Sequence, residues 1–191
     1  MMAVFAEQLD SHIAVMQSVQ QLAPVVEKVA QQWIKALEND GKILLMGNGG
    51  SAADAQHIAA ELVGRYLNER RGLPAIALTT DTSILTAVGN DYGYDSIFAR
   101  QVEALARPAD IVVGYSTSGN SANICNAITI ANKIGCYCVA LTGATGGKLV
   151  DLADSCIRVP STETPRIQEA HAFIGHMLCE YVDRAFAPAE C

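Results

Sequence analysis

The feature that most constrains the fold is a short apolar run that ends in closely spaced glycines and continues as a helix. Residues 44–46 are Leu-Leu-Met, glycine occupies positions 47, 49 and 50, and a helical pattern follows as far as Glu61. Glycine lets the backbone bend through conformations that a Cβ atom would forbid, so amide groups at the helix N-terminus can face an anion or a hydroxyl group. The stretch therefore predicts a buried strand, a ligand-binding turn and a helix capped by Asn48 or Ser51.

The helix after the glycine turn carries His57 and Glu61, four residues apart. Residues at that spacing lie on one face of a helix, so the pair can hold a metal ion or move a proton. Gln168 and His176 on the last predicted helix lie about 80° apart around its axis, so both can face the same site. Two histidines and a glutamate suit zinc, with glutamine as an unusual oxygen donor, and His171 is a rival ligand on the same helix. The alternative is a solvated helix face without a metal.

Short apolar runs alternate with helical patterns along the rest of the chain. The five predicted strands cover residues 42–46, 74–78, 111–115, 136–142 and about 156–159. Besides the helix of His57 and a short helix before the last strand, the predicted helices cover residues 5–22, 24–39, 83–88, 96–106, 122–134 and 164–186. Residues 89–93 are expected to break the helix before them. Thr164 is expected to cap the last helix, with Pro165 at its first position.

Strands that are continuously apolar and separated by helices indicate a parallel sheet covered on both faces. We therefore predict one α/β domain over residues 1–191, with an N-terminal helical pair in residues 1–40 and a doubly wound core in residues 41–191. For five strands in the order 2-1-3-4-5, ligands bind beyond the carboxyl ends of strands one and three, where the strand order reverses. The loops at those two strand ends are the glycine turn and residues 116–121.

The second of these loops reads Ser-Thr-Ser-Gly-Asn-Ser from Ser116 to Ser121 and precedes a helix. Its four hydroxyl groups and its backbone amides can hold a phosphate without a lysine. The alternative is an ordinary loop that caps the helix, for which one such residue suffices. The glycine turn matches neither the GxGxxG spacing of a dinucleotide site nor the lysine of a P-loop.

Composition excludes several classes of function. The chain has 191 residues and a net charge of -7, with scattered basic residues, which argues against non-specific nucleic-acid binding. Its apolar runs fall short of the roughly 18 residues of a membrane span. The first ten residues contain two acids and no basic segment, so we expect no secretory signal and a cytoplasmic protein. The six cysteines lie mostly within apolar patterns and form no CxxC pair, which favours free buried thiols.

Four motifs, in this order along the chain, resemble the bacterial sedoheptulose-7-phosphate isomerases, also called phosphoheptose isomerases. They are residues 47–57, 89–91, 116–121 and 166–169. The resemblance spans nearly the whole chain and implies the sugar-isomerase (SIS) fold, a five-stranded parallel sheet. It also implies an aldose-ketose isomerase that converts sedoheptulose 7-phosphate to D-glycero-D-manno-heptose 7-phosphate through an enediol or enediolate. That reaction is the first step towards ADP-heptose and the heptose of lipopolysaccharide.

Matching by position, the resemblance implies one zinc ion per subunit, held by His57, Glu61, Gln168 and His176. Glu61 and His176 are then the candidate acid–base pair, and Asp91 is the reserve base. The implied substrate contacts are Asn48, Gly49, Gly50, Glu61, Asn90, Asp91, Ser116, Thr117, Ser118, Ser121 and Gln168. The resemblance further implies a homotetramer whose active sites are shared between subunits, with a role for the N-terminal helices at an interface.

Two alternatives come from the same fold. One is a non-enzymatic tetramer that binds the replication initiator DnaA, in which the positions equivalent to Glu61 and His176 are not conventional metal ligands. Here both ligands are present. The other is the sugar-phosphate-sensing domain of a regulator, which usually carries a separate DNA-binding segment, and this chain has neither room for one nor a basic patch.

Overall fold

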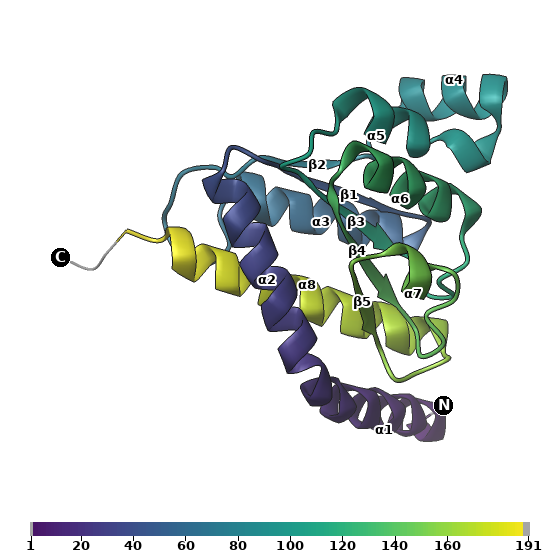
Figure 1. The fold of residues 1–191 in the computed structure, drawn as a ribbon. Coiled ribbons are helices and arrows are strands. Elements are labelled where there is room, and N and C mark those ends of the chain that lie inside the picture. The colour runs from purple at the N-terminus through teal and green to yellow at the C-terminus, as the bar shows by residue number, and fades with distance from the viewer. Residues whose placement is uncertain (1, 189–191) are drawn as a thin grey trace.

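Five parallel strands form one sheet in the order β2-β1-β3-β4-β5 in the computed structural model, which describes residues 2–188 (Figure 1). The strands are β1 Ile43–Gly47, β2 Ala75–Ala77, β3 Ile111–Tyr115, β4 Tyr137–Thr142 and β5 Ser155–Arg158. All residues of β1 and β3 are buried, as expected for central strands covered on both faces. The predicted fold class and strand order are confirmed, and the order reverses between β1 and β3.

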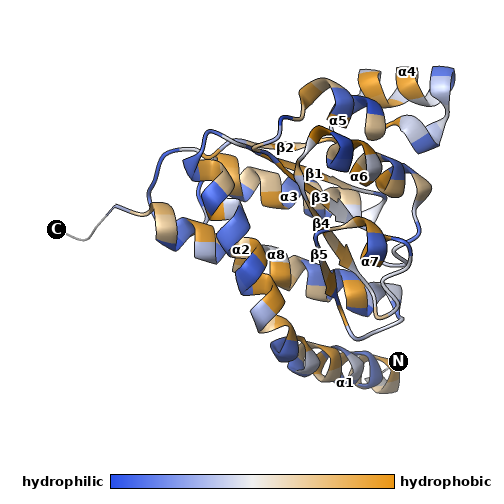
Figure 2. Ribbon diagram, in the orientation of Figure 1, coloured by the Kyte–Doolittle hydropathy of each residue, from blue (hydrophilic) through white to orange (hydrophobic). Residues whose placement is uncertain are grey.

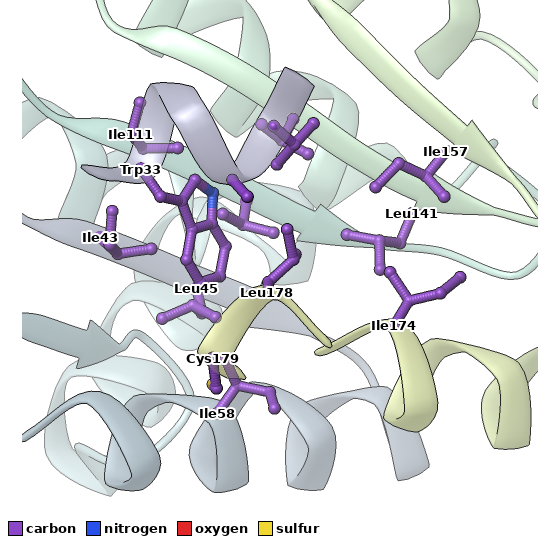
Figure 3. Close-up of a cluster of buried hydrophobic side chains, with 14 of the residues drawn as sticks. Trp33, Ile43, Leu45, Ile58, Ile111, Leu141, Ile157, Ile174, Leu178 and Cys179 are labelled. Atoms are coloured by element: carbon purple, nitrogen blue, oxygen red, sulfur yellow. The ribbon is translucent and has the colours of Figure 1, made fainter. Parts of the chain in front are cut away.

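Helices cover both faces of this sheet. One face packs against α2 (Ala23–Glu38), α3 (Gly50–Val63) and α8 (Thr164–Phe186). Figure 3 shows this layer, in which the side chains include Trp33, Leu45, Ile58, Leu141 and Leu178. The other face packs against α5 (Ala99–Leu105), α6 (Ala122–Ile134) and the short α7 (Leu149–Leu152).

Successive residues of β1 serve the two layers in turn. Leu45 belongs to the layer under α2 and α8, whereas Leu44 and Met46 belong to the layer under α5 and α6. Side chains alternate between the faces of a strand, so a continuously apolar strand supplies both cores. Figure 2 shows the result, with hydrophobic colouring concentrated in the strands and hydrophilic bands on the outer helices.

The predicted N-terminal helical pair is present. It consists of α1 (Met2–Val19), a 3₁₀ turn η1 (Gln20–Leu22) and α2. In Figure 1, α1 extends away from the sheet. It is held to the start of α8, where Arg166 donates to the carbonyl of Gln8 and Nδ1 of His12 lies 2.8 Å from Glu169 Oε2. Apolar side chains remain exposed along α1 at positions 4, 5, 9 and 13.

Helix α4 (Thr82–Tyr92) corrects one prediction, because it continues through Gly89 instead of breaking there. An isolated glycine weakens a helix by about 1 kcal/mol relative to alanine, which is too little to end it. The helix ends at Gly93, where φ is +84°, a value that favours glycine. Its N-cap is Asp81, whose carboxylate accepts a hydrogen bond of 2.9 Å from the amide of Ile84.

Two predicted helix caps are also wrong. Gly49 takes the N-cap position of α3, with φ of +58°, whereas the side chain of Asn48 is bonded to Asn123 of α6 and to Tyr94. Glu163 takes the N-cap position of α8, so Thr164 is already the first helical residue, followed by Pro165. In both cases glycine or proline sets the start of the helix through its backbone geometry.

Two other predictions concern composition. Five cysteines are free and at least partly buried, as predicted, and Cys191 lies outside the described residues. Within residues 2–188, none of the helices combines the length and the apolar character needed to cross a membrane.

Candidate active site

The two predicted ligand loops begin side by side, because Gly47 and Tyr115 are register partners at the carboxyl ends of β1 and β3. Asn48 joins them. Its Nδ2 donates to Oδ1 of Asn123 (3.0 Å), Nδ2 of Asn123 donates to its Oδ1 (2.9 Å), and the Tyr94 hydroxyl also donates to that oxygen (3.0 Å). Asn48 is therefore fixed by protein groups. Asn123 and Tyr94 were missed from the sequence, since neither belongs to a recognisable motif.

A metal-competent cluster lies between α3 and α8. Nε2 of His57 is 3.1 Å from Oε1 of Glu61 and 3.3 Å from Nε2 of His176. Donor atoms of all three residues lie within 4.8 Å of one another. Ligands at about 2.0–2.2 Å from a tetrahedral zinc ion are roughly 3.4 Å apart, so this spacing fits a shared ion. The sequence spacing placed His57 and Glu61 together, and the packing of α8 on α3 adds His176.

Gln168 lies nearer the start of α8 than the donor cluster does. It precedes His176 by eight residues, about 12 Å along the axis of α8. Its amide group packs against Gly50, where the side-chain nitrogen would be 2.8 Å from an added Cβ atom. Gly50 therefore leaves room for Gln168 at the start of α3, one reason for a glycine there. The role of Gln168 as fourth metal ligand stays a prediction.

The loop from Ser116 to Ser121 is held by its own side chains. The hydroxyls of Ser116 and Ser121 are 2.9 Å apart, and the Ser118 hydroxyl accepts a hydrogen bond of 3.1 Å from the amide of Asn120. Gly119 has a φ of +68° and packs so closely on the carbonyl of Gly146 that a Cβ atom would overlap it. The loop is therefore a compact, pre-formed element.

A cleft of about 280 Å³ opens beside this loop. All residues that line it are uncharged: Thr117, Ser118, Asn120, Ala144, Thr145, Ser161, Thr162, Thr164 and Ile167. Ser161 and Thr162 of the loop between β5 and α8, and Thr164 at the start of α8, thus add three hydroxyl groups that the sequence motif did not include. A cleft lined by neutral donors suits an anion whose charge is held by hydrogen bonds, because hydrogen bonds to a charged acceptor are stronger than neutral ones.

Asn90 and Asp91 are not brought to the donor cluster within this chain. They are exposed on α4, and Nδ2 of Asn90 donates to Oδ1 of Asp91 (2.8 Å). Leu85 and Val88 of the same helix pack on the sheet face opposite to α8 (Figure 1). The predicted contact of Asn90 and Asp91 with substrate stays a prediction.

His171 occupies the core rather than the donor cluster. It is completely buried, and its Nε2 lies 3.2 Å from the carbonyl oxygen of Thr142. Burial lowers the pKa of His171 to about 4, so the ring is neutral at pH 7. Its rival role as a metal ligand finds no support in this geometry.

Two side-chain oxygens among the described residues, near His171 and His57, lack a hydrogen-bond partner. Within residues 2–188, the hydroxyl of buried Tyr115 and Oδ2 of Asp54 have no hydrogen-bond partner. Burial raises the pKa of Asp54, partly offset by nearby His57.

Comparisons with known proteins agree with this fold. The family model described as the SIS domain matches residues 8–143. Phosphoheptose isomerase of Geotalea daltonii is 56% identical over 178 residues, which cover 93% of each chain. The solved phosphoheptose isomerases of Neisseria gonorrhoeae and Francisella tularensis superpose with TM-scores of 0.91 and 0.93, at 44% and 40% identity, and each pair covers 96% of this chain and 98% of the solved one.

The Vibrio vulnificus NanR protein has the same fold, with a TM-score of 0.70, at only 16% identity. The fold and the family match therefore place this chain in the class of SIS-domain proteins. Within that class, the chain belongs to the phosphoheptose isomerases, which makes it an enzyme that acts on a sugar phosphate.

Proposed function

We propose that this isomerase converts sedoheptulose 7-phosphate to D-glycero-D-manno-heptose 7-phosphate, the first step towards ADP-heptose and the lipopolysaccharide core. The observation that carries the proposal is the approach of His57, Glu61 and His176 between α3 and α8, in a chain that also has the neutral hydroxyl loop and its cleft. A donor cluster and an anion cleft are the two parts that an isomerase of sugar phosphates needs.

The chemistry that we propose moves a proton between adjacent carbons through a cis-enediol. Such a transfer needs a base near one carbon, an acid near the oxygens and stabilisation of the developing negative charge. Glu61 and His176 are our candidate pair. Both reach the Nε2 atom of His57, at 3.1 and 3.3 Å, so both can serve one bound substrate.

The donor set fits zinc, and we propose one ion per subunit, with Gln168 as the fourth ligand. When bound, zinc supplies Lewis-acid polarisation of substrate oxygens. A metal-bound carboxylate is a weaker base, so Glu61 must be free of the metal to take the proton. Asp91 is the reserve base, and we propose that another subunit supplies it, since α4 packs on the opposite face of the sheet from α8.

We assign the phosphate group of the substrate to the loop of Ser116, Thr117, Ser118 and Ser121. The neutral lining of the adjacent cleft and the loop position before α6 support this assignment. The remaining substrate contacts that we propose are Asn48, Gly49, Gly50, Glu61, Asn90, Asp91 and Gln168.

The assembly that we propose is a cytoplasmic homotetramer with shared active sites. Two features support it. Phe5, Leu9 and Ile13 form an exposed apolar stripe at four-residue spacing on α1, and Asn90 and Asp91 are exposed on α4, outside the donor cluster. Binding of the DnaA initiator, the alternative function, gives no reason for two histidines and a glutamate within 4.8 Å.

The experiment that tests the function is turnover of sedoheptulose 7-phosphate by purified, zinc-loaded protein in deuterated water. We expect isomerisation with deuterium at C2 of the aldose product, because the proton passes through an exchanging base. Absence of turnover would contradict the proposed substrate. Turnover with full retention of the substrate hydrogen would replace the enediol route by a hydride shift.

A further inference from the structure

The segment that follows α3, residues 64–72, is joined to α8 by a buried ion pair. Nε of Arg70 donates to Oδ1 of Asp183 over 2.8 Å, and the two side chains are 0% and 1% exposed. A buried pair of this kind carries a large desolvation cost, which is offset only when further hydrogen bonds satisfy both groups. Here both groups have such bonds.

Arg70 uses the rest of its guanidinium group to bind the end of α3. Nη2 donates to the carbonyl of Glu61 (2.8 Å), and Nη1 donates to the carbonyls of Leu62 (3.0 Å) and Gly64 (3.3 Å). Carbonyls in the last turn of a helix lack partners within the helix, so Arg70 caps the turn that carries Glu61. Its planar set of donors suits this multiple contact, and lysine lacks it.

Asp183 completes the link from the other side. Its Oδ2 accepts the amides of Leu67 (3.1 Å) and Asn68 (2.7 Å). Asp183 follows His176 by seven residues, so the two side chains lie within about 20° of each other around α8. The ion pair therefore connects the helix turn of Glu61 to the helix face of His176.

Tyr66 belongs to the same segment and contacts His176 directly. The two rings are stacked, with centroids 5.6 Å apart and an angle of 29° between their planes. The His176 ring also meets the His57 ring edge-on, with centroids 4.9 Å apart and an angle of 83° between the planes. The orientation of His176 thus depends on a residue outside the donor cluster.

We propose that residues 64–72 are a positioning element for the metal cluster, in which Arg70 and Asp183 fix the turn of Glu61 and Tyr66 orients the His176 ring. This inference rests on the proposed zinc site. Residues that orient metal ligands without touching the metal typically change its affinity tenfold to a hundredfold when they are replaced.

A second buried carboxylate provides a matched control. Asp110 accepts the amides of Lys42 (2.9 Å) and Arg107 (2.7 Å) and pairs with Nζ of Lys42 (2.6 Å), the same set of bonds as Asp183. Its partners, Lys42 and Arg107, belong neither to the donor cluster nor to residues 64–72. Asp183→Asn and Asp110→Asn therefore remove equivalent interactions, of which only the first is joined to the helices of the donor cluster.

The first experiment measures zinc affinity by competition with a chromophoric chelator, and the free energy of unfolding by urea, for the wild type and both variants. We expect Asp183→Asn to bind zinc at least tenfold more weakly than Asp110→Asn when both are folded. Cobalt-loaded Asp183→Asn should also show an altered visible absorption band, because the ligand geometry changes. Equal zinc affinity of the two variants would overturn the role of the ion pair.

The second experiment uses Tyr66, which is half-buried at the margin of the core, where leucine keeps an apolar side chain. Tyr66→Leu should weaken zinc binding several-fold and lower kcat more than it changes KM, whereas Tyr66→Phe should retain both values because the ring remains. Wild-type affinity in Tyr66→Leu would overturn the role of Tyr66. A wild type that binds no zinc would overturn the proposed zinc site itself, which separates that failure from failure of this inference.

Discussion

The two halves of the site are built in different ways. The hydroxyl loop lies within six consecutive residues, and its internal hydrogen bonds, such as that between Ser116 and Ser121, join near neighbours in the chain. The donor cluster joins His57 to His176 across 119 residues and exists only because α8 packs on α3. The loop is thus a local structure, whereas the cluster depends on the tertiary fold. Substitutions in the two halves should therefore have separable effects, on phosphate binding and on chemistry.

The largest effect is expected from Glu61 and His176. Glu61→Gln and His176→Ala should each lower kcat at least 100-fold, the lower end of usual acid–base contributions. Both side chains are only partly buried, so circular dichroism should show an unchanged fold. Steady-state kinetics with sedoheptulose 7-phosphate measures the loss, and full turnover by Glu61→Gln would move the role of base to Asp91.

His57→Ala should separate metal binding from the hydroxyl loop. The wild type should contain about one zinc per chain by elemental analysis, and the variant should lose more affinity than the tenfold to hundredfold typical of a supporting residue. Binding of inorganic phosphate should stay unchanged, because the loop is built locally. If His57→Ala retains full zinc occupancy, the ligand assignment is wrong.

Ser118→Ala should give the converse result. Loss of one hydrogen bond to a charged group costs about 1.5–3 kcal/mol, or roughly tenfold to over a hundredfold in binding. KM should rise by such a factor and inorganic phosphate should become a poorer inhibitor, while zinc affinity stays at the wild-type value. If KM and the inhibition constant of inorganic phosphate are both unchanged in Ser118→Ala, the phosphate binds elsewhere.

The same division explains what the sequence could predict. Five apolar strands separated by helices predicted a doubly wound parallel sheet, and the four-residue spacing of His57 and Glu61 predicted their shared helix face. Contacts between segments far apart in the chain leave no such regular spacing in the sequence from which they could be predicted. The reciprocal hydrogen bonds of Asn48 with Asn123 and the stack of Tyr66 on His176 are of this kind.

Local rules failed where the effect of one residue was overestimated. Gly89 costs its helix too little to end it, and α4 continues to Tyr92. His171 and His176 have the same chemistry and lie on the same helix. Only the packing of α8 shows that His171 is in the core and His176 in the donor cluster.

His171 belongs to neither half of the site, so its titration should report on the fold alone. Burial lowers its pKa from 6.5 to about 4, which means that the unfolded chain binds a proton more readily than the folded one. The stability from the neutral ring is complete above pH 6.5 and falls as the pH drops from there towards 4. Between pH 7.5 and 5.5 the free energy of unfolding should fall by about 1 kcal/mol on this account.

Urea unfolding of the wild type and of His171→Gln at these two pH values measures that contribution. The window lies above the range in which most carboxylates titrate, so their effect on the difference is small. The variant is expected to be less stable at pH 7.5, since it alters the buried contact with Thr142, but it should lack this part of the pH dependence. Equal pH dependence in both proteins would mean that His171 can be protonated inside the fold. A water or an acidic partner would then have to lie at its Nδ1 atom, which has no hydrogen-bond partner within residues 2–188.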